Sequence, residues 1–177
     1  MKDKILSQIK KMNGSLLGIG IDDEEMLNAI EENDKIDLCY ILSNNGSPSN
    51  KKFKIFERGR QKKINIKKLK KHFRKKSIDN ILCDYNTVKK FLRSFIPGSV
   101  YINKGYLYIY GNERELDNLK EKYQRYTSDI KLIKKDKTFM LIINNQNAKS
   151  NILKDNVYKV KDLSSDMLDI LTDLLTN

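Results

Sequence analysis

Two glycines alternate with apolar residues in the stretch "LLGIGID", which spans positions 16 to 22. Because glycine has no side chain, Gly18 and Gly20 would let a ligand approach the backbone closely. Asp22 follows at the start of a predicted helix, where a carboxylate complements the positive end of the helix dipole. The same two glycines also suit an ordinary turn from a strand into a helix, so the spacing leaves both interpretations open.

A second candidate site follows the apolar run "IDNILCDY", which ends in Asp84 and Tyr85. Side chains at the carboxyl end of a buried strand reach the edge of a sheet where open α/β folds bind their ligands. An aspartate there could contact a cofactor or a substrate amine, and it could equally cap the helix that follows. We take Asp84 and Tyr85 as the candidate catalytic residues, with the cap as the alternative for Asp84.

The residues that usually hold metals are few and scattered. Cys39 and Cys83 both lie within apolar, strand-like runs, which predicts buried, reduced thiols. The single histidine, His72, lies among lysines. We therefore predict no metal site and no histidine-based triad. No phosphate-binding loop with its lysine is present in the sequence, which argues against phosphoryl transfer.

Positive charge is concentrated between positions 51 and 76. The chain has a net charge of +12, and this segment holds fourteen Lys or Arg residues and one acid, so the rest of the chain is close to neutral. We predict that the segment binds nucleic acid, RNA before DNA, with a solvated face and an anionic membrane surface as alternatives. The candidate nucleic-acid-binding residues are Arg58, Arg60, Lys62, Lys63, Lys67, Lys70, Lys71 and Arg74.

Alternating strand-like and helix-like segments must position these residues. Apolar runs of strand length lie at 15–21, 36–42, 78–85 and 106–110, with an edge-like strand at 52–58, and helical periodicity occurs at 4–11, 22–30, 65–76, 86–96 and 112–126. This order predicts an α/β fold with a doubly wound, mainly parallel sheet of about seven strands. A tight turn within 129–143 predicts a C-terminal antiparallel hairpin.

The run "YLYIY" at 106–110 is predicted to be an interior strand. We expect the helices before and after it to pack on opposite faces of the sheet, so that both sets of its side chains are buried. Pro97 and Gly98 are expected to end the helix that precedes this strand.

We expect three parts along the chain: an N-terminal helix at 1–14, one Rossmann-like domain at 15–148, and a strand and amphipathic helix at 149–177. The last helix, at 164–175, would pack on the core or on a second copy of the chain in a homodimer. The sequence has no apolar run of 18 residues and no secretory signal. We therefore predict no membrane span and a cytoplasmic location.

The order of elements from about residue 15 to residue 145 resembles the Rossmann-like fold of class I S-adenosylmethionine-dependent methyltransferases. The segments "IDNILCDY" and "YINKGYLYIYG" are similar to the fourth and fifth strands of that family. The resemblance implies S-adenosylmethionine as the cofactor, and a position for several side chains around it. Those implied near the cofactor are Gly18, Gly20, Asp22 and Asn44, and those near the acceptor are Asp84 and Tyr85.

The sequence departs from that family at the cofactor-binding positions. Leu16 replaces the acid of the glycine-rich motif, and Asn44 lies where an acid usually pairs with the ribose. The stretch "DYNT" lacks the two prolines of amino-group methylating members. We therefore predict a degenerate methyltransferase-like domain that binds RNA or another polyanion and no cofactor. The alternatives are an active S-adenosylmethionine-dependent methyltransferase acting on nucleic acid and a protein-interaction module.

Overall fold

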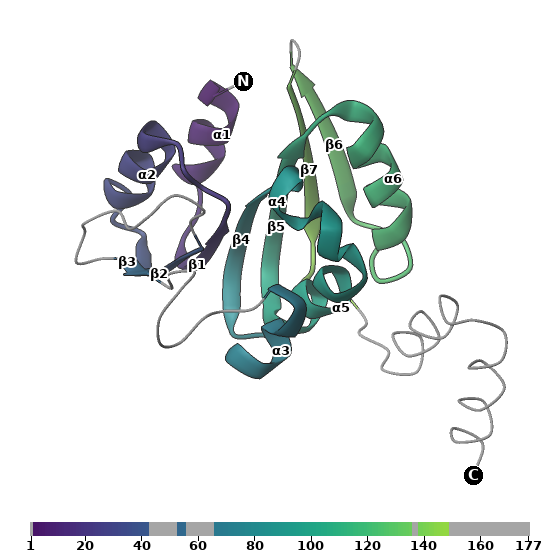
Figure 1. The fold of residues 1–177 in the computed structure, drawn as a ribbon. Coiled ribbons are helices and arrows are strands. Elements are labelled where there is room, and N and C mark those ends of the chain that lie inside the picture. Colours follow the sequence, from purple (N-terminus) through teal and green to yellow (C-terminus); the bar gives the residue numbers. More distant parts are fainter. Residues whose placement is uncertain (1, 43–52, 56–65, 136–137, 149–177) are drawn as a thin grey trace, which may run out of the picture.

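The computed structural model describes residues 2–42, 53–55, 66–135 and 138–148, whose strands form one sheet in the order β3-β2-β1-β4-β5-β7-β6 (Figure 1). Strands β1 to β5 pair in parallel, and β7 is antiparallel to both β5 and β6. This confirms the predicted α/β fold with a mostly parallel sheet and a C-terminal antiparallel pair. The strands are β1 (Gly14–Ile19), β2 (Ile36–Leu42), β3 (Phe53–Ile55), β4 (Ile78–Asp84), β5 (Asn103–Gly111), β6 (Ile130–Lys135) and β7 (Thr138–Asn144).

Helices cover both faces of the sheet, and each face has its own apolar core. One core joins the sheet to α1 and α2, and the other joins it to α3, α5 and α6. The helices of the first face are α1 (Lys2–Ile9) and α2 (Glu24–Glu31). Those of the second face are η1 (Ile66–Lys68), α3 (Leu69–His72), α4 (Tyr85–Val88), η2 (Lys89–Phe91), α5 (Leu92–Ile102) and α6 (Glu113–Tyr123).

The helices on either side of β5 pack on the same face, which corrects the prediction that they take opposite faces. Phe95 of α5 and Leu116 of α6 belong to one core cluster, together with Leu107 of β5. Right-handed crossovers that proceed in one direction along a sheet place their helices on one face, and the face changes only where the direction reverses. That reversal lies between β1 and β4. The two helices after β4 and β5 therefore share a layer.

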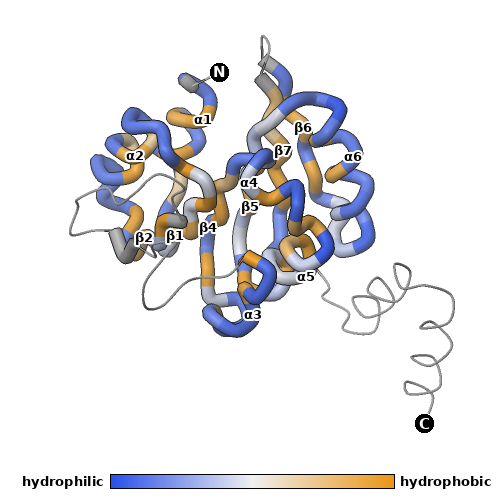
Figure 2. Tube along the Cα trace, in the orientation of Figure 1, coloured by the Kyte–Doolittle hydropathy of each residue, from blue (hydrophilic) through white to orange (hydrophobic). Residues whose placement is uncertain are grey.

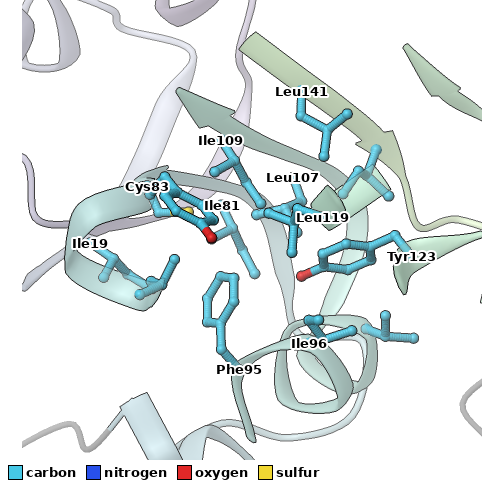
Figure 3. Packing of buried hydrophobic residues seen from close by; sticks show 14 of the residues in the cluster. Ile19, Ile81, Cys83, Phe95, Ile96, Leu107, Ile109, Leu119, Tyr123 and Leu141 are labelled. Atoms are coloured by element: carbon cyan, nitrogen blue, oxygen red, sulfur yellow. The ribbon is translucent and has the colours of Figure 1, made fainter. Parts of the chain in front are cut away.

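The prediction that both sets of β5 side chains are buried is wrong for one end of the strand. Leu107 and Ile109 are fully buried on the α5 and α6 face, as Figure 3 shows. On the opposite face Tyr108 is buried, but Tyr106 is 38% exposed. The core around Tyr108 includes residues of α1 and α2, and Tyr106 lies outside that core, so its side chain remains partly exposed.

Helix α5 continues through Pro97 to Ile102, so the expected end at Pro97 and Gly98 is wrong. A proline inside a helix costs about 3 kcal/mol, and burial of the residues beyond it offsets that cost. Val100 and Ile102 are fully buried in the core. Gly98 has a separate role, because a Cβ there would lie 3.3 Å from Cβ of Leu69 in α3.

The basic helix is shorter than predicted. The expected helix at 65–76 consists of η1 and α3 and ends at His72. Phe73 has extended backbone dihedrals, and its ring meets Tyr40 edge-on with 5.1 Å between ring centroids. Because Tyr40 belongs to β2, this contact places the chain after α3 against the sheet. The predicted strand and helix after residue 148, and most of the predicted strand at 52–58, lie outside the described residues.

Candidate functional site

The strand order reverses between β1 and β4, which makes their carboxyl ends the place where an open α/β sheet normally binds a ligand. Strand β1 ends at Ile19 and β4 ends at Asp84. The turn after β1 and the helix after β4 therefore meet at this point. Gly20 and Asp84, two of the candidate residues, lie at these adjoining strand ends.

Both glycines of "LLGIGID" face side chains of the protein itself. Gly20 has a φ of +70°, and a Cβ on it would lie 2.8 Å from Cβ of Thr87 in α4. A Cβ on Gly18 would lie 2.7 Å from Cδ1 of Ile41 in β2. The missing side chains thus allow β1 to pack against β2 and against the start of α4.

Asp84 caps the helix that follows it. Its carboxylate accepts hydrogen bonds from the backbone N–H of Asn86 at 3.2 Å and from the Thr87 hydroxyl at 3.3 Å. Tyr85 is buried, and its Cβ would be 2.9 Å from a Cβ placed on Gly111. Burial, with a smaller contribution from Glu115, raises the pKa of Tyr85. The structure therefore places Asp84 at the strand edge and Tyr85 in the core beside β5.

Tyr110, which the sequence analysis did not select, also reaches this edge. Its hydroxyl donates a hydrogen bond to the carbonyl oxygen of Gly20 at 3.4 Å. Burial raises its pKa first of all, and the nearby carboxylates of Asp84, Asp22 and Asp23 raise it further. Tyr110 therefore stays a neutral donor. The alternation of β5, which directs every second side chain to one face, was the signal that could have identified it.

The remaining cofactor candidates are Asp22 and Asn44, of which only Asp22 lies within the described residues. Asp22 is exposed, whereas Asp23 caps α2 by accepting a hydrogen bond from the Met26 N–H at 3.1 Å. Asn44 lies outside the described residues. Carboxylates of Asp22, Asp23 and Asp84 give this edge of the sheet a negative character.

A second candidate site is a positively charged surface on the helical layer that contains α3 and α5. Lys67 lies over the Phe91 ring, 5.0 Å from its centroid, and Lys70 lies over the Tyr101 ring at 5.4 Å. These contacts join η1 and α3 to η2 and α5. Figure 2 shows mainly hydrophilic residues along α3 in this layer. We call this surface the basic face and define it by its exposed cations Lys67, Lys68, Lys70, Lys71, Arg74, Lys75, Lys89, Lys90 and Arg93.

The basic face contains four of the predicted nucleic-acid-binding residues and five cations that were not among them. Lys67, Lys70, Lys71 and Arg74 belong to it, and Arg58, Arg60, Lys62 and Lys63 lie outside the described residues. Of these five cations, Lys68 and Lys75 lie within the predicted basic segment 51–76, and the others, Lys89, Lys90 and Arg93, come from a separate segment. Their signal in the sequence was the absence of any acid between positions 85 and 102.

A polar cleft of about 360 Å³ lies on the opposite face of the sheet, beside α1. Tyr106 and Tyr108 form part of its wall, and Lys11, Asp129 and Lys131 line it. Within the described residues, no three His, Cys, Asp or Glu side chains gather as a metal site. No described helix is long and apolar enough to cross a bilayer.

The strand order and the two helical layers define the class I methyltransferase-like fold, and solved structures share it. A SAM-dependent methyltransferase from Archaeoglobus fulgidus aligns with a TM-score of 0.57 and 10% identity, over 81% of this chain and 94% of that one. A putative tRNA methyltransferase from Streptococcus pneumoniae, solved with S-adenosyl-L-methionine, aligns with a TM-score of 0.52 and 13% identity, over 96% and 86%.

Spermidine synthase from Thermotoga maritima aligns with a TM-score of 0.56 and 12% identity, over 85% of this chain. This chain spans only 59% of the length of that enzyme. No protein-family model and no curated protein sequence matches the chain. At these identities the similarity establishes the fold, which confirms the resemblance inferred from the order of elements.

Proposed function

We propose that this chain is a methyltransferase-like domain that binds RNA, or another polyanion, through the basic face. The observation that carries the proposal is the distribution of charge in one helical layer. The elements η1, α3, α4, η2 and α5 contain seven Lys or Arg residues and no Asp or Glu. Helix α6, in the same layer, carries both signs of charge. The positive charge is therefore specific to one part of this layer.

The geometry of the basic face suits phosphate groups. Its cations are exposed, and all but Arg74 and Lys75 lie on helices that pack on the core through Leu69, Phe95 and Ile96. Lysines act as mobile point charges toward phosphates, and the guanidinium groups of Arg74 and Arg93 can bind them through two parallel hydrogen bonds. We therefore expect binding that depends on the nucleic-acid backbone more than on base sequence.

Two half-buried aromatic rings favour RNA over DNA in this proposal. Phe91 and Tyr101 pack partly against the core beneath Lys67 and Lys70. Single-stranded RNA exposes its bases, which stack on aromatic side chains next to cations. One structural neighbour is described as a putative tRNA methyltransferase, which is consistent with an RNA ligand.

We further propose that the S-adenosylmethionine site is degenerate. A cofactor loop uses glycine so that ligand atoms can approach the backbone. Here Thr87 occupies the space in front of Gly20, and Ile41 occupies the space in front of Gly18. Asp23 and Asp84 cap helices with their carboxylates. These groups serve the fold itself, and the residues present do not fit the cofactor well.

RNA binding is tested with a fluorescent single-stranded RNA and its hairpin counterpart, titrated at several salt concentrations. The triple variant Lys89→Gln, Lys90→Gln, Arg93→Gln should bind about tenfold more weakly and lower the salt slope by about two. The matched control is Lys10→Gln, Arg114→Gln, Lys122→Gln, three exposed cations outside the basic face. An equal loss of RNA affinity in both variants, or an affinity that does not change with salt concentration, would contradict the proposal.

Calorimetry with S-adenosylmethionine and S-adenosylhomocysteine tests the degenerate site. We expect no binding heat at millimolar ligand. A dissociation constant in the micromolar range would overturn that part and favour an active methyltransferase acting on nucleic acid. The positive φ of Gly20 beside Asp84 is the observation that supports this alternative. Gly18, Gly20 and Asp22 would then lie near the cofactor and Asp84 or Tyr85 near the acceptor.

The proposal keeps the division of the chain into residues 1–14, 15–148 and 149–177, and a cytoplasmic location. A protein-interaction module remains the third function, in which residues 164–175 pair two copies of the chain. Light scattering of the full chain separates a homodimer from a monomer. A dimer whose RNA affinity does not depend on the basic face would favour the interaction module.

A further inference from the structure

We propose that residues 162–177, the acidic segment of this chain, dock on the basic face and compete with RNA for it. The inference rests on the proposed RNA binding for its function, but the docking itself is independent of RNA. Three observations support it: the place where the described chain ends, the charge of the acidic segment, and the half-buried apolar rings on the basic face.

The described chain ends beside the basic face. The Lys76 ammonium donates hydrogen bonds to the carbonyl oxygens of Asn145 at 2.7 Å and of Asn103 at 3.0 Å, and the Lys76 N–H donates to the Tyr101 carbonyl. Ala148, three residues after Asn145, is buried in the core that contains α3 and α5. Tyr101 is the ring beneath Lys70. The described chain therefore ends on the same side of the sheet as the cations, close to the α3–β4 connection.

The acidic segment is complementary in charge to the basic face. Residues 162–177 contain four Asp and no Lys or Arg, in a chain whose net charge is +12. Asp166, Asp169 and Asp173 follow one another at spacings of three and four, so on a helix they would form one edge. That edge would lie beside the apolar stripe of Leu163, Ile170 and Leu174. A helix of this kind offers carboxylates and apolar side chains along one side.

The basic face offers both kinds of partner. Its exposed lysines and arginines suit the carboxylates, and Phe91, Leu92 and Tyr101 are only partly buried against the core. The apolar stripe would cover these three side chains, and the three aspartates would form ion pairs with lysines around them. Each ion pair at such an exposed surface contributes little, so the docking depends on several pairs together with the apolar contact.

The chain between Ala148 and the acidic segment is long enough to reach the basic face and short enough to keep the acidic segment near it. Residues 149–161 form a link of 13 residues. A 13-residue chain without regular structure would have an end-to-end distance of about 20 Å, which would give an effective concentration in the millimolar range near its origin. Weak contacts suffice at that concentration. The polar cleft beside α1 is a poorer site, because it lies across the sheet from Ala148 and already pairs Asp129 with the Asn144 amide.

Docking is measured first without RNA. A nitroxide is attached to Thr172→Cys on the full chain, whose own Cys39 and Cys83 are buried. We expect paramagnetic broadening of amide signals in α3, η2 and α5, lost when Asp166, Asp169 and Asp173 are changed to Asn. Broadening around Tyr106 and Ile142, or none in the folded domain, would overturn the proposal. Mixing isotope-labelled chains without nitroxide and unlabelled chains with it tests docking between copies, and broadening there would also overturn it.

Competition is then measured with the same RNA titration. Asp166→Asn, Asp169→Asn, Asp173→Asn should bind RNA about three- to tenfold more tightly at low salt, with the gain disappearing at high salt. The control Asp34→Asn, Asp117→Asn, Glu121→Gln removes the same charge from exposed positions elsewhere and should gain much less. Equal gains would show a net-charge effect and refute competition. If the chain binds no RNA at all, the nitroxide experiment still decides the docking.

Discussion

Gly20 lies directly against Thr87, so that the turn after β1 and the first turn of α4 touch where the strand order reverses. A Cβ on Gly20 would lie 2.8 Å from Cβ of Thr87 and 3.2 Å from its Cγ2. The Tyr110 hydroxyl holds the carbonyl of the same glycine. The glycine that most resembles a cofactor residue in the sequence is thus part of a packed junction between three strand ends.

Replacing Gly20 by alanine should destabilise the protein by about 2–3 kcal/mol, because a positive φ costs about 1–2 kcal/mol and the new methyl group overlaps Thr87. Urea unfolding measures the change. The double variant with Thr87→Ala should recover part of the lost stability, whereas the cost of the positive φ should remain. A loss below about 0.5 kcal/mol for Gly20→Ala would mean that the junction opens easily, as a ligand site would require.

Ser99 and Tyr123 form a hydrogen bond of 2.7 Å inside the α5 and α6 core, where both are fully buried (Figure 3 labels Tyr123). Because the Ser99 hydroxyl also lies 2.8 Å from the Ile96 carbonyl, to which it donates, the Tyr123 hydroxyl is the donor to Ser99. Ser99→Ala should cost about 1–3 kcal/mol because it leaves a buried phenol without an acceptor. The double variant with Tyr123→Phe should cost less than the sum of the single changes, as unfolding free energies would show.

Asp79 should stabilise the fold at neutral pH and stop doing so in acid. Burial alone raises the pKa of its carboxyl, but hydrogen bonds from Ser15 and the ammonium of Lys104 at 3.0 Å outweigh burial and lower it. A carboxyl with a lowered pKa stabilises the folded state above its unfolded value of about 3.9, and the effect disappears as the pH falls through the folded value.

The variant Asp79→Asn should therefore lose about 1 kcal/mol of stability at pH 7, and the difference from the parent protein should shrink below pH 4. Urea midpoints of both proteins between pH 7 and pH 2.5 test this. Lys104→Gln should show a smaller loss, since the Lys104 side chain is about half exposed. A difference that stays constant with pH would exclude a role for the carboxylate charge.

The thiols of Cys39 and Cys83 should be unreactive in the folded protein. Both are free and fully buried, and burial, with a smaller contribution from Asp84, raises the pKa of the Cys83 thiol, so little thiolate is present. A thiol reagent should label neither cysteine until urea unfolds the chain. Fast labelling of Cys83 under native conditions would show that the carboxyl edge of β4 opens.

The sequence by itself determined the kinds of elements and their order. Strands buried on both faces need nearly continuous apolar residues, as in β2 and β4, and amphipathic helices need apolar residues at a spacing of three and four. Helix starts were equally local, because Asp23 and Asn112 cap α2 and α6 with their own side chains. The excess of positive charge was also readable, since it is a property of composition.

Tertiary structure alone decided which residues became neighbours. The placement of α5 and α6 on one face followed from the strand order, a nonlocal property that no segment contains. Burial of Val100 and Ile102 stabilises α5 beyond Pro97, although proline is unfavourable inside a helix. Lys67 and Phe91 are 24 positions apart, and their contact joined a second group of cations to the first. Local patterns fix what an element is, whereas packing fixes where its side chains lie.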